Sequence, residues 1–263
     1  MKSKGIATIV LASAAFLVSC QKDDLNISPQ PFPSRIEKIS MDNDLMTLNY
    51  DAGGRVSTVS LPDQIQGGAT PVEFTISYDA ASRITKLSNG TDYTITPVYE
   101  NNELSRVQAT NASNETIYVT DYEYLNGFLK SAVVKVDDGS GGLTNGLKFI
   151  YLYDANGNVS KTQMYIGHFG GSAWLYVGSQ EFTYDNKVNP LKNIKSLLQI
   201  LLLNISGNNI LTDKSLDATG QVEQTQTFTY TYNSQNLPVS ATVQILETGS
   251  VPVSKQVRYT YKP

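Results

Sequence analysis

The chain has 263 residues, a net charge of −4, one cysteine, one histidine, one tryptophan and sixteen tyrosines. The acidic balance argues against a nucleic-acid partner, because such binding needs a basic surface that displaces phosphate counterions. The single cysteine excludes a disulfide framework and a four-thiolate zinc site, and the single histidine excludes multi-histidine metal sites. We therefore predict that the protein uses no cofactor and no metal.

Residues 1–19 are typical of a lipoprotein signal peptide. Lys2 and Lys4 form a positive start, and residues 5–18 are a mostly apolar run, too short to cross ~30 Å of hydrocarbon as a helix. The run ends at residues 17–20, Leu-Val-Ser-Cys, which resemble the bacterial lipobox, where the cysteine is acylated and the chain is cut before it. A plain signal peptide is the alternative, but Cys20 has no second cysteine with which to pair. We predict that acyl chains on Cys20 hold the protein to a membrane.

Residues 20–34 are expected to form a tether behind the lipidated cysteine. Residues 21–24, Gln-Lys-Asp-Asp, are similar to the tag that sends Bacteroidetes lipoproteins to the outer face of the outer membrane; the alternative is an ordinary solvated linker. Pro29, Pro31 and Pro33 prevent strand pairing and favour an extended chain of ~3 Å per residue. We therefore expect an outer-membrane lipoprotein exposed at the cell surface.

Residues 35–263 are predicted to form a single β domain built on a repeated hairpin. Each unit has a tyrosine, a turn rich in Asp, Asn and Gly, and an aliphatic residue that starts the return strand. The tyrosines are Tyr50, Tyr78, Tyr99, Tyr124, Tyr153 and Tyr232, and a seventh unit at Tyr184 departs from the pattern. We expect each ring to pack while its hydroxyl stays in water. We interpret Asp51, Asp79 and Asp154 as turn residues with no catalytic role.

Between the turns, apolar and polar side chains alternate with a period of two, as in residues 72–78, 222–232 and 239–245. There are about sixteen such segments, and a sheet of that length must curl or close to manage its edges. We predict an all-β fold in which antiparallel hairpins form a rolled sheet or β-barrel of about 14–16 strands. The polar face lacks the ~25 Å apolar band of a membrane-spanning barrel, so we expect a soluble exterior.

The Tyr-Asp-x-x-Gly-Arg units are similar to the YD repeats of RHS-type proteins, although Tyr99-Glu100 and Tyr124-Leu125 depart from that pattern. The lipobox, the YD-like hairpins, the segment 184–190 and the closing Tyr259-Thr260-Tyr261 together resemble a family of Bacteroidetes lipoproteins of unknown function with a porin-like β fold. This resemblance implies a fold and a location. It implies no activity and no catalytic residues.

The single histidine, His168, lies in an aromatic-rich hairpin that also contains Tyr165, Phe169, Trp174 and Tyr176. Glycines flank His168 and no Gly-x-Ser-x-Gly motif accompanies it, so we interpret it as a loop residue and predict no catalytic residues. Aromatic faces with polar edges are typical of carbohydrate-binding surfaces, and these five residues are our candidate ligand site. The alternative is that Trp174 and Tyr176, which share one face of a strand, belong to the core.

One helix is predicted as an insertion at residues 190–204. Asn189 can cap it and Pro190 suits its first position. An apolar stripe follows at helical spacing: Leu191, Ile194, Leu198, Leu201, Leu202 and Ile205. We expect the helix to close one end of the barrel and to bury this stripe; the alternative is that the stripe docks a protein partner.

We predict a surface-anchored, non-enzymatic lipoprotein that binds a ligand, with glycan as the favoured class. One alternative is a structural or envelope-accessory protein that engages a protein partner. The other is a carboxylate-type hydrolase, which needs only two acids about 5–9 Å apart. An exposed Trp174 would favour the first, an exposed leucine stripe on residues 191–205 the second, and paired acids in a cleft the third.

Overall fold

A computed structural model describes residues 35–41, 43–61, 71–90, 92–167, 173–203 and 206–262. The signal peptide, Cys20, the tether, His168 and Phe169 lie outside the described residues, so the predictions made for them stay predictions.

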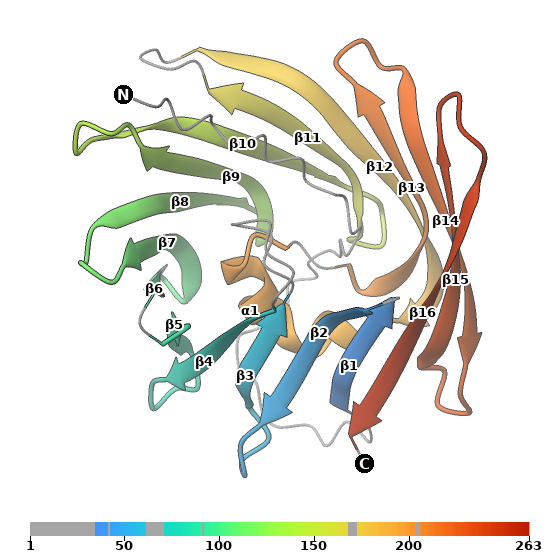
Figure 1. Cartoon of the computed structure of the whole chain (residues 1–263), viewed down its shortest axis with the longest axis horizontal. Coiled ribbons are helices and arrows are strands. Elements are labelled where there is room, and N and C mark those ends of the chain that lie inside the picture. Colours follow the sequence, from blue (N-terminus) through green and yellow to red (C-terminus); the bar gives the residue numbers. More distant parts are fainter. Residues whose placement is uncertain are drawn as a thin grey trace.

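Within the described residues, sixteen antiparallel strands close into a single barrel (Figure 1). Each strand pairs with its neighbours in the chain, and the first strand pairs with the last, which closes the sheet. The predicted all-β barrel of about 14–16 strands is therefore confirmed. The strands are β1 (Arg35–Met41), β2 (Asn43–Tyr50), β3 (Val56–Leu61), β4 (Val72–Tyr78), β5 (Ile84–Ser88), β6 (Tyr93–Glu100), β7 (Glu103–Asn111), β8 (Thr116–Leu125), β9 (Phe128–Asp137), β10 (Leu143–Tyr153), β11 (Val159–Gly167), β12 (Trp174–Val188), β13 (Asn208–Asp217), β14 (Val222–Tyr232), β15 (Pro238–Glu247) and β16 (Val253–Lys262).

Alternation along each strand separates an inner wall from an outer wall. Val59, Leu87 and Val107 are fully buried on the inner wall, where apolar area removed from water stabilises the fold by about 25 cal/mol per Å². Thr227 and Thr229 on β14 alternate with the buried Gln226 and Phe228 and are exposed. None of the helices in the described part of the chain is both long and apolar enough to cross a membrane.

The predicted turn role of the repeat aspartates is confirmed. The Asp51 carboxylate accepts hydrogen bonds from the backbone N–H and the guanidinium of Arg55, both at 2.8 Å, and Asp79 holds Arg83 in the same way. The backbone bond is the main cause of the lowered pKa of each carboxyl group. Asp154 accepts from the backbone N–H of Asn158.

Most of the repeat tyrosine hydroxyls differ from the prediction, because they form hydrogen bonds within the protein instead of staying in water. The hydroxyl of Tyr78 donates to the carbonyl of Val56 at 2.7 Å, and that of Tyr184 donates to Val159 at 2.6 Å. In each case the acceptor is the first residue of the return strand in an earlier unit. The same kind of bond recurs at Tyr50, Tyr153 and Tyr261. A half-buried hydroxyl needs a partner, and a carbonyl at a strand end is free to accept. These bonds link successive units.

Arginines extend the link between units. The Arg55 guanidinium, held by Asp51, lies 4.8 Å from the ring centroid of Tyr78, and Arg83 lies 5.4 Å from that of Tyr99. Each Asp-Arg pair therefore also covers the tyrosine of the next unit.

The chain between β12 and β13 forms a short 3-10 helix, η1 (Pro190–Ile194), followed by α1 (Lys195–Ile200). The Asn189 side chain accepts from the N–H of Leu191 at 2.8 Å, which confirms the predicted cap. The helix is shorter than the predicted 190–204, because Leu202 adopts a left-handed φ of 62° that ends the helical path.

The first part of the predicted apolar stripe is buried, whereas Leu201 and Leu202 are partly exposed and Ile205 lies outside the described residues. Leu191 and Leu198 are 2% and 0% exposed. The hydroxyl of Tyr122 on β8 donates to the carbonyl of Gln199 at 2.8 Å, and the Gln199 amide donates to the hydroxyl of Tyr124. The segment therefore packs inside the ring of strands, at the end that carries the repeat tyrosines (Figure 1).

Candidate functional site

The candidate aromatic residues that the structure describes lie on the outer wall of the barrel. Tyr165 on β11 is opposite Lys148 on β10 and Tyr176 on β12, and Trp174 is opposite Gly167. All three aromatic side chains are partly exposed and stand outside the hydrophobic core and the residues packed against it. The interpretation of Trp174 and Tyr176 as core residues is therefore wrong. Binding by these residues stays a prediction.

These side chains form a compact group, which we call the aromatic strip: Tyr165, Trp174, Tyr176 and Lys148. The rings of Tyr165 and Tyr176 lie 5.4 Å apart at 58°. The Lys148 ammonium lies 5.8 Å from the centroid of the Trp174 ring, within the range of a cation–π contact. A ligand at this strip would meet flat apolar faces, phenol hydroxyls and one positive charge.

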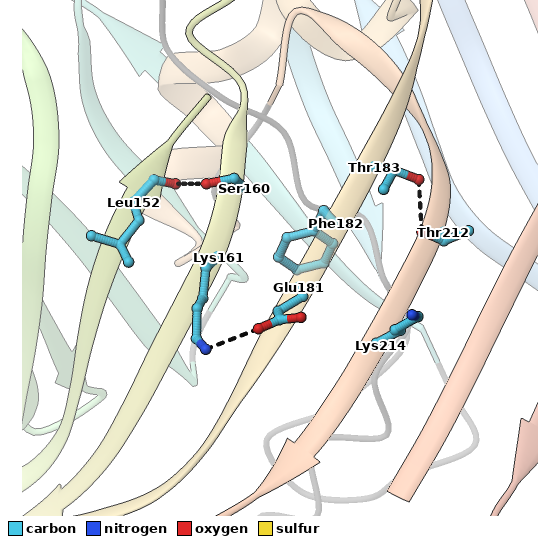
Figure 2. A pocket seen from close by; sticks show the side chains of 8 residues that line it. All are labelled: Leu152, Ser160, Lys161, Glu181, Phe182, Thr183, Thr212 and Lys214. Atoms are coloured by element: carbon cyan, nitrogen blue, oxygen red, sulfur yellow. Dashed lines mark hydrogen bonds and ion pairs between the residues drawn. The ribbon is translucent and has the colours of Figure 1, made fainter. Parts of the chain in front are cut away.

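A groove with a volume of about 380 Å³ lies on the outer wall of β10–β13 (Figure 2). We call it the outer groove; it is lined by Leu152, Ser160, Lys161, Glu181, Phe182, Thr183, Thr212 and Lys214.

Polar contacts order the groove. Lys161 and Glu181 form an ion pair at 2.9 Å, and the hydroxyls of Thr183 and Thr212 bond to each other at 2.6 Å. Lys214 is exposed and has no ion-pair partner among the described residues. The groove thus combines hydroxyls, an ion pair and an available ammonium.

The aromatic strip and the outer groove lie along the same strands. Tyr165 and Lys161 are four residues apart on β11 and point to the same side, which corresponds to ~13 Å at ~3.4 Å per residue. Gln163 on β11 and Ser179 on β12 are opposite each other between them. The aromatic strip and the outer groove are therefore separate features of the same strands.

The groove offers a poor arrangement for two-carboxylate hydrolysis. Of its eight lining residues, Glu181 alone is a carboxylate, and it is held by Lys161. A glycosidase of the common type needs a second acid across the scissile bond. Within the described residues, no group of three or more His, Cys, Asp and Glu side chains is placed to hold a metal ion.

Sequence reasoning missed a buried carboxyl group on the inner wall. Asp213 on β13 is 1% exposed, lies opposite Phe182 and Gln226, and neither of its oxygens has a hydrogen-bond partner. Burial raises its pKa to about 7. Its chain neighbours Thr212 and Lys214 both line the outer groove. Because side chains alternate between the two faces of a strand, Asp213 points inward, and this alternation could have predicted its inward position from the sequence.

Sequence reasoning also missed the three lysines of the outer surface. Lys148, Lys161 and Lys214 come from three different strands and meet only through cross-strand pairing. Alternation along each strand predicts which face of the strand each lysine occupies. It does not predict that the three lysines lie close together. The β12–β13 pairing brings together residues on either side of the helical insertion.

The comparisons with known proteins support the fold. The chain is similar to a porin-like protein from Bacteroides uniformis ATCC 8492, with 14% identity, a TM-score of 0.56, and coverage of 88% of this chain and 97% of that chain. It is also similar to a porin-like protein from Bacteroides vulgatus ATCC 8482, with 12% identity, a TM-score of 0.53, and coverage of 88% and 99%. At these identities the likeness shows the fold alone. No family model and no curated protein matches the chain, so membership of the lipoprotein family that it resembles is not shown.

Proposed function

We propose that this protein is a non-enzymatic, surface-anchored lipoprotein that binds glycans on the outer wall of its barrel. The observation that carries the proposal is the position of Trp174: it lies outside the core, beside Tyr176 and Tyr165. Stacking of a sugar ring on an aromatic face removes apolar area from water, while the phenol edges remain available for hydrogen bonds.

Anchoring on the outer membrane is the second part of the proposal. It rests on the apolar leader, the lipobox ending at Cys20 and the acidic tag that follows. Multiple acyl chains give stable attachment where one chain gives only reversible binding. An anchored barrel on an extended tether would present its outer wall to polymers outside the cell.

The test is a thermal-shift panel on the mature chain, residues 20–263, with Cys20→Ser so that no acyl chain is present. Host and plant glycans are screened with and without calcium. A ligand at 100 times its Kd stabilises the folded state by ~2.7 kcal/mol, which gives a clear rise in Tm. We expect a rise with one glycan class that is lost in Trp174→Ala.

The control is Leu246→Ala, which removes an exposed apolar side chain from β15, away from the aromatic strip. This variant should keep the full rise in Tm. A panel without any response, or a response that survives Trp174→Ala, would refute the proposal. Far-ultraviolet circular dichroism of both variants checks that the barrel is intact.

A further inference from the structure

The outer wall of β7–β13 carries several basic side chains in the middle of its strands. Away from the turns and strand ends, the basic side chains of this wall are Arg106, Lys130, Lys135, Lys148, Lys161 and Lys214, and the acidic ones between them are Asp121, Glu123 and Glu181. This set carries a net charge of +3. Further acids lie at the turns and strand ends of the same part of the chain, among them Asp137, Asp138, Asp154 and Asp217.

The acids of this wall are already neutralised by neighbours. Asp121 is bound by Arg106 at 2.6 Å and by Lys135 at 2.8 Å. Burial opposes its ionisation, but these two bonds outweigh burial and lower its pKa. Glu123 is bound by Lys130 at 2.7 Å, and this bond lowers its pKa. The charge of Lys148 makes a smaller contribution to the lowered pKa of Glu123, and Lys214 lies opposite Glu181, but the ion pairs of these acids are made by other lysines and by arginine.

Lys148 and Lys214 are the lysines of this wall that form no ion pair among the described residues, and they lie in the aromatic strip and in the outer groove, respectively. Lys148 lies over Trp174 in the aromatic strip, and Lys214 lines the outer groove next to the Lys161–Glu181 pair. A group that approaches the indole meets the Lys148 ammonium, and a ligand that extends along β11–β13 reaches Lys214.

The outer wall of β14–β16 carries the exposed Arg258 and is otherwise mostly polar and uncharged in the middle of its strands. Its strands present hydroxyls and amides that bond to one another across strands: Thr231 to Ser240 and Gln256 to Thr242. Lys148, Lys161 and Lys214 lie on the same wall as the aromatic strip and the outer groove.

We propose that the ligand is an anionic glycan, a saccharide with carboxylate or sulfate groups, which lies along the outer wall from the aromatic strip to the outer groove. This inference rests on the proposed glycan binding and specifies its chemical class. The aromatic rings bind the sugar faces, and Lys148 and Lys214 bind the anionic groups. Opposite charge on ligand and wall also raises the rate of encounter at low salt.

The test compares polygalacturonate with its fully methyl-esterified form, because the two share a backbone and differ in charge. Chondroitin sulfate is added to distinguish sulfate from carboxylate. We expect a lower Kd for at least one anionic polymer than for the esterified polymer. Raising the salt from about 0.01 M to about 0.15 M should weaken that binding, since the Debye length falls from ~30 Å to ~8 Å.

Variants locate the charge contacts. Lys148→Gln and Lys214→Gln should each raise the Kd for the anionic polymer by up to about fivefold, the upper range for a solvent-exposed pair. They should leave weak binding of the esterified polymer unchanged. Lys86→Gln, on the exposed side of β5, is the matched control and should have no effect on either Kd.

The outcomes separate the two proposals. Equal affinity for the charged and esterified polymers, lost in Trp174→Ala, overturns the anionic class and leaves glycan binding standing. Failure of every polymer to bind overturns both. Equal binding to phosphatidylglycerol vesicles that is unaffected by Trp174→Ala also overturns the inference, because it shows attraction to any anionic surface.

Discussion

Replacing Asp213 with asparagine should remove a loss of stability that the barrel undergoes as the pH rises to neutrality. The folded barrel holds the carboxyl group of Asp213 in a buried position without a hydrogen-bond partner, and burial raises its pKa from the ordinary 3.8 to about 7. Because the folded-state pKa is raised, the folded state binds the proton more tightly than the unfolded chain does. The barrel therefore loses stability as the pH rises from about 4 to about 7, and the full penalty is present above pH 7.

The magnitude follows from the two pKa values. At about 1.4 kcal/mol per pKa unit, the full penalty is about 4 kcal/mol, of which roughly 2.5 kcal/mol develops between pH 5 and pH 8. The amide introduced by Asp213→Asn carries no titratable proton. The variant should therefore lack this part of the pH dependence, whatever constant cost its buried amide adds.

The assay is urea unfolding of the wild type and of Asp213→Asn at pH 5 and pH 8, followed by circular dichroism. The free energy of unfolding of the variant relative to the wild type should rise by about 2.5 kcal/mol from pH 5 to pH 8. Asp217→Asn is the control, because the pKa of this exposed carboxyl is lowered by its bond from Thr219. An equal pH dependence in Asp213→Asn and the wild type would refute the reasoning.

Two further predictions concern the links between units and the helical insertion. Tyr78→Phe removes the hydroxyl bond to the earlier unit and should lower the free energy of unfolding by about 1 kcal/mol. The control, Tyr165→Phe on the outer wall, should change the free energy of unfolding by less than about 0.5 kcal/mol. Urea unfolding at one pH measures both variants, and equal losses would contradict a linking role for the Tyr78 hydroxyl. Leu198→Ala removes a fully buried side chain and should lower the free energy of unfolding by about 2–5 kcal/mol. The control, Asn193→Ala, changes an exposed residue and should have almost no effect. An unchanged Tm in Leu198→Ala would show that the insertion does not support the barrel.

Local chemistry made much of the architecture predictable. Asp51 and Asp79 occupy turns whose bonds run to residues two and four positions away, so the interactions that place them are contained in the repeat. The cap at Asn189 is also a contact between residues two positions apart. Alternation with period two needs no knowledge of partners, which is why the strands and a curled or closed sheet were predictable without the structure.

Sidedness and long-range contacts were not readable in this way. The pattern that put Trp174 and Tyr176 on one face of a strand did not say whether that face is inner or outer. The destination of each tyrosine hydroxyl is a carbonyl in another unit, such as the one from Tyr78 to Val56, 22 residues away. These choices depend on which strand lies alongside, and therefore on the closed sheet.

The sequence by itself determined the repeated hairpin, its turns, the alternating strands and the capped insertion, because each depends on neighbours within a few residues. The tertiary structure alone decided three things: the β1–β16 closure, the outward position of the aromatic strip, and the burial of Asp213. The physical reason is that a strand has two chemically distinct faces but no intrinsic inside. Closure of the sheet assigns one face to the core and brings Lys148, Lys161 and Lys214, from three strands, onto one wall.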